Sequence, residues 1–127
     1  MFEIFLDNNG GIFMRIIKSK ETAESSNSEK CKIFDYPFED ENMDLCVSVI
    51  TGRYPEGGYC KHLVCKELIY ILEGSGKLCF ENKTVEFSEG DAVWINPNEK
   101  YYWDTKYCKI TITCSPAFNP EQYIYTD

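Results

Sequence analysis

No stretch of this chain has the apolar periodicity of an amphipathic helix of ten or more residues, and this constrains the fold more than any other feature. The sequence instead alternates short runs rich in β-branched and aromatic residues with turns of Gly, Asn and Pro. Runs 2–6 and 12–17 flank the sequence NNGG at 8–11, which predicts a hairpin because Asn and Gly accept positive φ. The whole pattern predicts an all-β sandwich or barrel, and a double-sheet jelly roll suits it best.

A chain of 127 residues is expected to form one domain, and the turn pattern divides it into four segments. These are an N-terminal hairpin at 1–18, a polar, Ser-rich loop at 19–30, a barrel core at about 31–114, and a C-terminal tail at 115–127 with room for one helical turn. Within the core, the alternation in run 107–114 places four side chains on one face of a strand: Cys108, Ile110, Ile112 and Cys114.

The run 67–72 is apolar on both faces of its predicted strand, because Leu68, Tyr70 and Leu72 alternate with Glu67 and two isoleucines. A strand of this composition is expected to be covered on both sides. The face that carries Leu68, Tyr70 and Leu72 is therefore predicted to lie in a homodimer interface or beneath the N-terminal hairpin.

The composition argues against two classes of partner. With 13 basic and 21 acidic residues the formal charge is −8, which argues against nucleic acid because basic side chains supply most of the affinity for a phosphate backbone. The chain contains no run of eighteen apolar residues, so no membrane span is predicted. The first residues lack the pattern of a signal peptide, and a cytoplasmic location is expected.

Most of the seven cysteines lie in strand-like runs, namely those at 31, 46, 79, 108 and 114. No C-x-x-C pair occurs, which argues against a zinc ribbon or a thioredoxin-type redox site. These five cysteines are therefore predicted to be small buried hydrophobes in a reducing compartment.

Segment 54–74 concentrates the side chains that carry chemistry. It holds the only histidine, His62, two residues after Cys60 and five before Glu67. Thiolate, imidazole and carboxylate groups bind a d-block metal when they converge. Residues 60 and 62 share one face of a strand, so convergence is geometrically plausible.

This segment resembles the first of the two signature motifs of the cupin superfamily, which are small β-barrels of the jelly-roll type. That motif runs His-x-His, three or four residues, Glu, six residues and Gly. Cys60, His62, Glu67 and Gly74 reproduce its spacing, with Cys60 in the place of the first histidine.

Residues 90–101 resemble the second motif, which runs from Gly-Asp through an apolar strand and a Pro to a final histidine. Pro97 matches the motif, Asn98 stands where Gly is usual, and Tyr101 takes the place of the histidine. The resemblance covers roughly residues 40–114 and implies a cupin-type double-stranded β-helix.

In the cupin family, three histidines and the glutamate hold a divalent metal inside the barrel. The resemblance implies a corresponding set of Cys60, His62, Glu67 and Tyr101 here. These donors would favour zinc, or iron or copper, over magnesium or calcium. The alternative is a barrel that has lost its metal and kept the cavity, with His62 and Glu67 hydrogen-bonded to each other.

The functional prediction is a cupin that binds a small molecule in the barrel interior, near the four residues of this set. The alternative is an enzyme of the isomerase, lyase or oxygenase type that acts on a small polar metabolite, with His62, Glu67 and Tyr101 as catalytic residues and a metal if one is bound. A purely structural homodimer with a filled core is a third possibility. Aromatic residues near the second motif either line the cavity or fill the core: Trp94, Tyr101, Tyr102, Trp103 and Tyr107.

Overall fold

The computed structural model describes residues 3–6 and 12–127, so the predicted hairpin turn at 8–11 lies outside the described residues. The elements in chain order are β1 (Glu3–Leu6), β2 (Ile12–Ile16), η1 (Ser19–Glu21), β3 (Ala23–Ser28), β4 (Cys31–Tyr36), β5 (Leu45–Ile50), β6 (Arg53–Tyr54), β7 (Tyr59–His62), β8 (Lys66–Phe80), β9 (Lys83–Ser88), β10 (Ala92–Ile95), β11 (Tyr101–Ser115), η2 (Pro120–Gln122) and β12 (Tyr123–Thr126).

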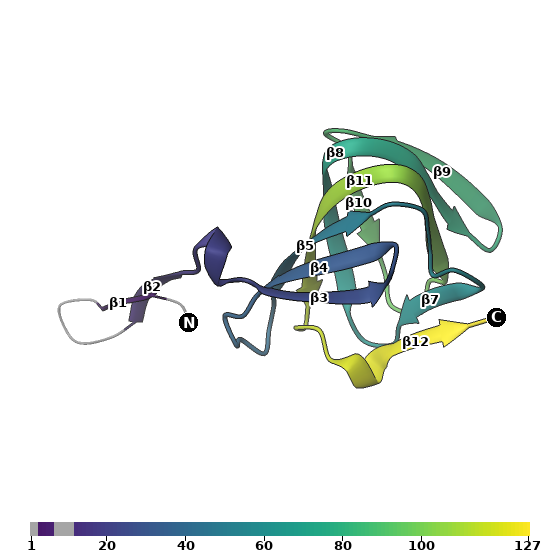
Figure 1. The fold of residues 1–127 in the computed structure, drawn as a ribbon. Helices are drawn as coiled ribbons and strands as arrows, with labels where there is room; N and C mark the ends of the chain where they lie inside the picture. The colour runs from purple at the N-terminus through teal and green to yellow at the C-terminus, as the bar shows by residue number, and fades with distance from the viewer. Residues whose placement is uncertain (1–2, 7–11) are drawn as a thin grey trace.

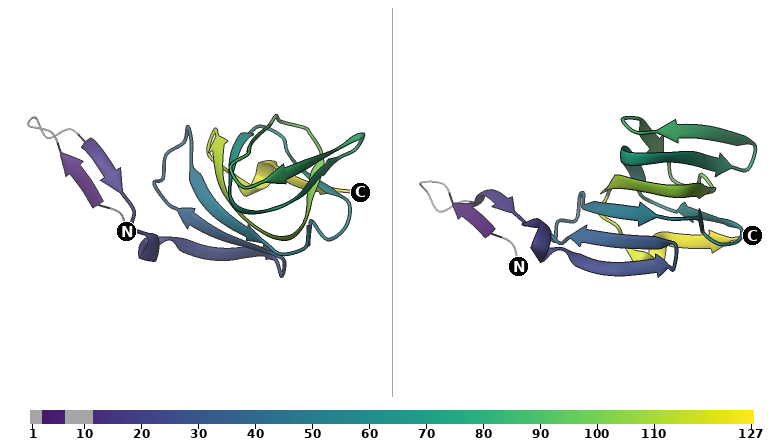
Figure 2. Two further views of the ribbon diagram at one scale, coloured as in Figure 1. Left: turned by 90° about the horizontal axis from the view of Figure 1, so that it is seen from above. Right: turned by 45° about the horizontal axis from the view of Figure 1, so that its top comes forward.

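Strands β3 to β12 form one antiparallel sheet that rolls into a barrel (Figures 1 and 2). The main path through the sheet is β10-β8-β11-β5-β4-β3. Strand β9 pairs with β8, strands β6 and β7 pair with β11, and β12 pairs with β7. The prediction of an all-β jelly-roll barrel is confirmed. No helix among the described residues is long and apolar enough to cross a membrane.

Strands β8 and β11 supply much of the barrel interior, and both show the expected period of two. The first half of β8 buries Glu67, Ile69 and Ile71 and exposes the residues between them. On β11, Cys108, Ile110 and Cys114 are buried and Ile112 packs against the core, so the predicted shared face is confirmed. The interior of the barrel is thus an apolar core with one buried carboxylate.

Two backbone positions explain features of the motifs. Gly74 has φ 87°, and a Cβ at this position would lie 2.1 Å from the Tyr107 carbonyl oxygen, so only glycine allows β8 and β11 to approach here. Asn98 has φ 68°, as expected for the residue that replaces a glycine in a left-handed turn. Both positions therefore keep the conformation that the motifs require.

Two segments differ from the sequence prediction. Residues 19–30 were expected to form a polar loop, but 23–28 form β3 and pair with β4. The reason is that backbone pairing at a sheet edge tolerates exposed Ser and Asn side chains, so propensity alone does not decide the outcome. The tail does form a single turn, η2, but then continues as β12 along β7, so the barrel extends beyond 31–114 at both ends.

The outer face of β8 is not covered by β1 and β2, the described strands of the N-terminal hairpin. Strands β1 and β2 pair with each other, and Figures 1 and 2 place them beyond one end of the barrel. Leu68, Tyr70 and Leu72 are 49%, 47% and 36% exposed, and Trp94 of the neighbouring β10 is 57% exposed. Of the two coverings that the sequence suggested for this face, a second copy of the chain is the one that we propose.

This proposal predicts that Tyr70→Asp converts a dimer to a monomer, because a carboxylate at the centre of an apolar interface cannot be solvated there. Sedimentation velocity of the wild type and the variant measures the change. Met43→Asp, which alters another exposed apolar side chain in the loop before β5, is the control and should leave the dimer intact. A Tyr70→Asp protein that stays dimeric would place the interface elsewhere.

Candidate active site

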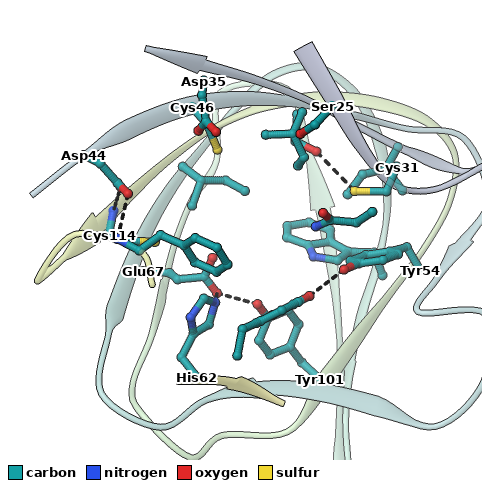
Figure 3. Close-up of a pocket in the computed structure, with 18 residues that line it drawn as sticks. Ser25, Cys31, Asp35, Asp44, Cys46, Tyr54, His62, Glu67, Tyr101 and Cys114 are labelled. Atoms are coloured by element: carbon teal, nitrogen blue, oxygen red, sulfur yellow. Dashed lines mark hydrogen bonds and ion pairs between the residues drawn. The ribbon is translucent and has the colours of Figure 1, made fainter. Parts of the chain in front are cut away.

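The barrel interior contains a partly open cavity of about 130 Å³ whose wall includes His62, Glu67 and Tyr101 (Figure 3). His62 is at the end of β7, Glu67 at the start of β8, and Tyr101 at the start of β11. All three side chains are nearly inaccessible to solvent, with exposed fractions of 3–4%. The structure therefore brings together three of the four residues that the sequence analysis singled out.

These three side chains form one hydrogen-bonded group. The Tyr101 hydroxyl donates to Glu67 Oε1, and His62 Nε2 lies 3.1 Å from the same oxygen. Burial, followed by the negative charge of Glu67, raises the pKa of Tyr101 well above its usual value. The hydroxyl therefore keeps its proton and remains a hydrogen-bond donor to the carboxylate.

Cys60 lies beside this group but does not line the cavity. It is fully buried, and its Sγ donates to the backbone carbonyl of Tyr101 at 3.5 Å. Burial raises the pKa of the Cys60 thiol to about 12, and the negative charge of Glu67 contributes to the rise. Cys60 is thus a neutral thiol packed behind the cavity wall.

The predicted metal set is not assembled in this structure. Among the residues that the structure describes, no group of three or more His, Cys, Asp and Glu side chains is placed to hold a metal ion. Cys60 points at a backbone carbonyl, and the Tyr101 oxygen keeps its proton. Because Cys60 is directed at that carbonyl and does not line the cavity, the four predicted ligands do not converge on one metal position.

Gln122 is part of the site although the sequence analysis did not select it. It lies in η2, is 8% exposed, and its Nε2 is 2.8 Å from His62 Nδ1. Gln122 is not a position of either motif, and it belongs to a tail that was expected to lie outside the barrel. The alternation of tyrosines in YIYT at 123–126 was the available signal that this tail forms a strand.

Two further carboxylates line the same cavity. Asp44 Oδ1 accepts a hydrogen bond from the backbone N–H of Cys114 and Oδ2 accepts one from Phe118, so it ties the C-terminal segment to the barrel. Asp35 shares the inner face of β4 with Cys31, and its side chain is more exposed than that of Asp44. Burial and the charge of Asp44 raise the pKa of Asp35. In the run 31–36, strand alternation places Asp35 on the same face as Cys31. A charged side chain on this otherwise apolar face was the available signal in the sequence.

The predicted aromatic wall is only partly correct. Tyr101 and Trp103 line the cavity, and Tyr54, Phe118 and Tyr123 join them from other elements. Trp94 points outward from β10, and Tyr107 is also exposed. The alternation within β10 explains the outward position of Trp94, because its neighbour Ile95 takes the inward one.

Comparisons with known proteins agree with this architecture. The family model described as "Cupin domain" matches residues 51–109. No curated protein matches the sequence. A variant of Pac13 from Streptomyces, solved with uridine, superposes with a TM-score of 0.77 at 14% identity and covers 87% of this chain and 88% of its own. Pac13 is described as a nucleoside dehydratase.

Two other solved structures share the fold. The polyketide cyclase RemF from Streptomyces resistomycificus has a TM-score of 0.65 at 17% identity and covers 81% of this chain and 80% of its own. An RmlC-like cupin from Shewanella frigidimarina has a TM-score of 0.69 at 15% identity, with coverage of 83% and 93%. At these identities the likeness concerns the fold, and one barrel supports many chemistries.

The environment of Cys60 predicts that its thiol resists alkylation in the folded protein, with or without a chelator. At pH 8 a thiol of pKa about 12 is ionised in only about one molecule in ten thousand, and the thiolate is the reactive form. Iodoacetamide labelling and peptide mass spectrometry of native and denatured protein measure this. Labelling of Cys60 that appears only after chelation would restore it as a metal ligand.

Proposed function

We propose that this chain, whose residues 51–109 match the cupin domain model, is a cupin that binds a small molecule inside the barrel, close to His62, Glu67 and Tyr101, with Cys60 behind the wall. The observation that carries the proposal is the cavity of about 130 Å³ with a buried, hydrogen-bonded polar group on its wall. A cavity of ~150 Å³ holds one benzene ring, so the enclosed part of the ligand is about this size. Apolar walls with a few convergent polar groups are typical of small-molecule sites.

The charges around the cavity narrow the class of ligand. Asp35, Asp44 and Glu67 line it, and none of the described residues that line it is a lysine or an arginine. Arg53 is engaged elsewhere, because its guanidinium donates to the carbonyls of Pro55 and Gly58. A phosphate or carboxylate would enter against three negative groups without a compensating charge. We therefore propose a ligand that is uncharged or cationic and donates hydrogen bonds.

A matched set of one-ring probes tests this proposal: benzylamine, benzyl alcohol and benzoate. Titrations followed by ¹H–¹⁵N NMR should shift resonances of the cavity residues with the amine and the alcohol, and benzoate should bind most weakly. Asp35→Asn should weaken amine binding by about tenfold, since a hydrogen bond to a charged group contributes roughly 1.5–3 kcal/mol.

The control for this experiment is Asp104→Asn, which removes the same charge from an exposed position on β11 outside the cavity. This variant should bind the three probes as the wild type does. Benzoate binding as tight as that of benzylamine would contradict the proposed ligand class. A complete lack of probe-induced shifts at the cavity would contradict the binding site itself.

A second candidate is a metal-independent acid–base enzyme, which the contact of Tyr101 with Glu67 favours. In an elimination, Glu67 would take a proton from a ligand carbon while Tyr101 gives its proton to a departing hydroxyl, so that a C=C bond forms and water leaves. The structurally similar nucleoside dehydratase makes this reaction class a reasonable choice. Entry of solvent deuterium into a ligand, absent with Glu67→Gln, would distinguish an enzyme from a binding module.

A further inference from the structure

The side chain of Gln122 lies between the loop after β7 and the ring of His62. Its Oε1 is 3.2 Å from the backbone nitrogen of Val64 and 3.2 Å from that of Cys65. Its Nε2 is 2.8 Å from His62 Nδ1, on the opposite side of the amide. The contacts with Cys65 and His62 are buried, and the contact with Val64 is partly buried.

These contacts decide which way the amide of Gln122 faces. A backbone N–H can only donate, so the atom that faces Val64 and Cys65 has to be the amide oxygen. The reversed amide would place an NH₂ group against two N–H groups and leave all of them unpaired in a buried place. The NH₂ group of Gln122 therefore faces His62.

The amide orientation in turn decides where the proton of His62 lies. An NH₂ group has no acceptor, so His62 Nδ1 has to accept and carries no proton. A neutral imidazole that accepts at Nδ1 carries its proton on Nε2. Rotating the ring by 180° would remove both nitrogens from their partners, so the ring orientation is fixed by the same contacts. Nε2–H then donates to Glu67 Oε1.

We propose that Gln122 is a positioning residue that holds His62 as the neutral, Nε2-protonated tautomer. Glu67 then accepts hydrogen bonds from both His62 and Tyr101, which makes the carboxylate the proton acceptor of the group and the other two its donors. An imidazolium would place Nδ1–H against the NH₂ of Gln122, where neither group can accept. The functional meaning of this assignment rests on the binding site proposed above, but the assignment itself does not.

The same arrangement bears on metal binding. With Nδ1 accepting from Gln122 and Nε2 protonated, neither ring nitrogen of His62 has a lone pair directed at the cavity. A histidine ligates a metal through a free ring nitrogen, and its other nitrogen then donates to a carbonyl or carboxylate. In this chain the partner of Nδ1 is a donor, which is the opposite of that requirement.

Because His62 is the only histidine, ¹⁵N NMR of the uniformly labelled full chain shows a single imidazole ring. Long-range ¹H–¹⁵N spectra distinguish a protonated ring nitrogen from one with a lone pair. In the wild type, Nδ1 should have the lone-pair shift and Nε2 the protonated shift. Gln122→Glu has nearly the same shape and keeps an oxygen for Val64 and Cys65, but it presents an acceptor to the ring, so the Nδ1 resonance should move to the protonated position.

The control is Asn119→Asp, which adds the same charge nearby and keeps the oxygen that accepts from Glu121 N–H. Its imidazole spectrum should match that of the wild type. A wild-type ring protonated at Nδ1, or a Gln122→Glu spectrum identical to the wild type while thermal melting shows a folded protein, would overturn the proposal. The measurement needs no ligand, so its failure is separate from a failure of the probes to bind.

Discussion

The paired ribbon of β8 and β11 is the constraint on which the rest of this structure depends. Glu67 pairs with Cys114 near one end of the ribbon and Tyr101 pairs with Phe80 at the other, yet the Tyr101 hydroxyl donates to Glu67. Residues at opposite ends meet because the ribbon arches around the barrel (Figure 1). The register shifts in β11 fall where such bending is expected, and Gly74 lets the two backbones come close at the bend. The polar group in the cavity is therefore a product of strand curvature.

The C-terminal segment completes what the ribbon begins. Asp44 accepts two backbone hydrogen bonds from the end of β11 and the segment after it, and Gln122 accepts two from the loop after β7. Each residue thus joins distant parts of the chain; Asp44 also lines the cavity, and Gln122 contacts the cavity residue His62. The proton positions at the site follow from this network of backbone hydrogen bonds. The barrel interior consequently holds a neutral histidine, a neutral tyrosine and a carboxylate together in a largely buried group.

The sequence predicted the parts of the fold that depend on local pattern. The turns, the strand alternation in β8 and β11, and the spacing from Cys60 to Gly74 and from Gly90 to Tyr101 all describe local geometry, and the barrel follows from them. The remaining strands depend on pairing between distant segments. Residues 23–28 form a strand because they pair with β4, and residues 123–126 because they pair with β7. The residues of β3 and β12 do not by themselves indicate these partners. Gln122 reaches His62 because β12, which follows it directly, pairs with β7. The spacing of Cys60 matched a metal ligand, but the direction of its thiol is a tertiary property.

We propose that the polar group of the cavity works without a metal, and elemental analysis is the direct test. Untagged protein would be purified without chelator, loaded with zinc, iron(II) or copper(II), desalted, and compared with Glu67→Gln. We expect the wild type to retain no more metal than the variant, because His62 has no free lone pair and Cys60 does not reach the cavity. Near-stoichiometric metal in the wild type that is lost in Glu67→Gln would contradict this account.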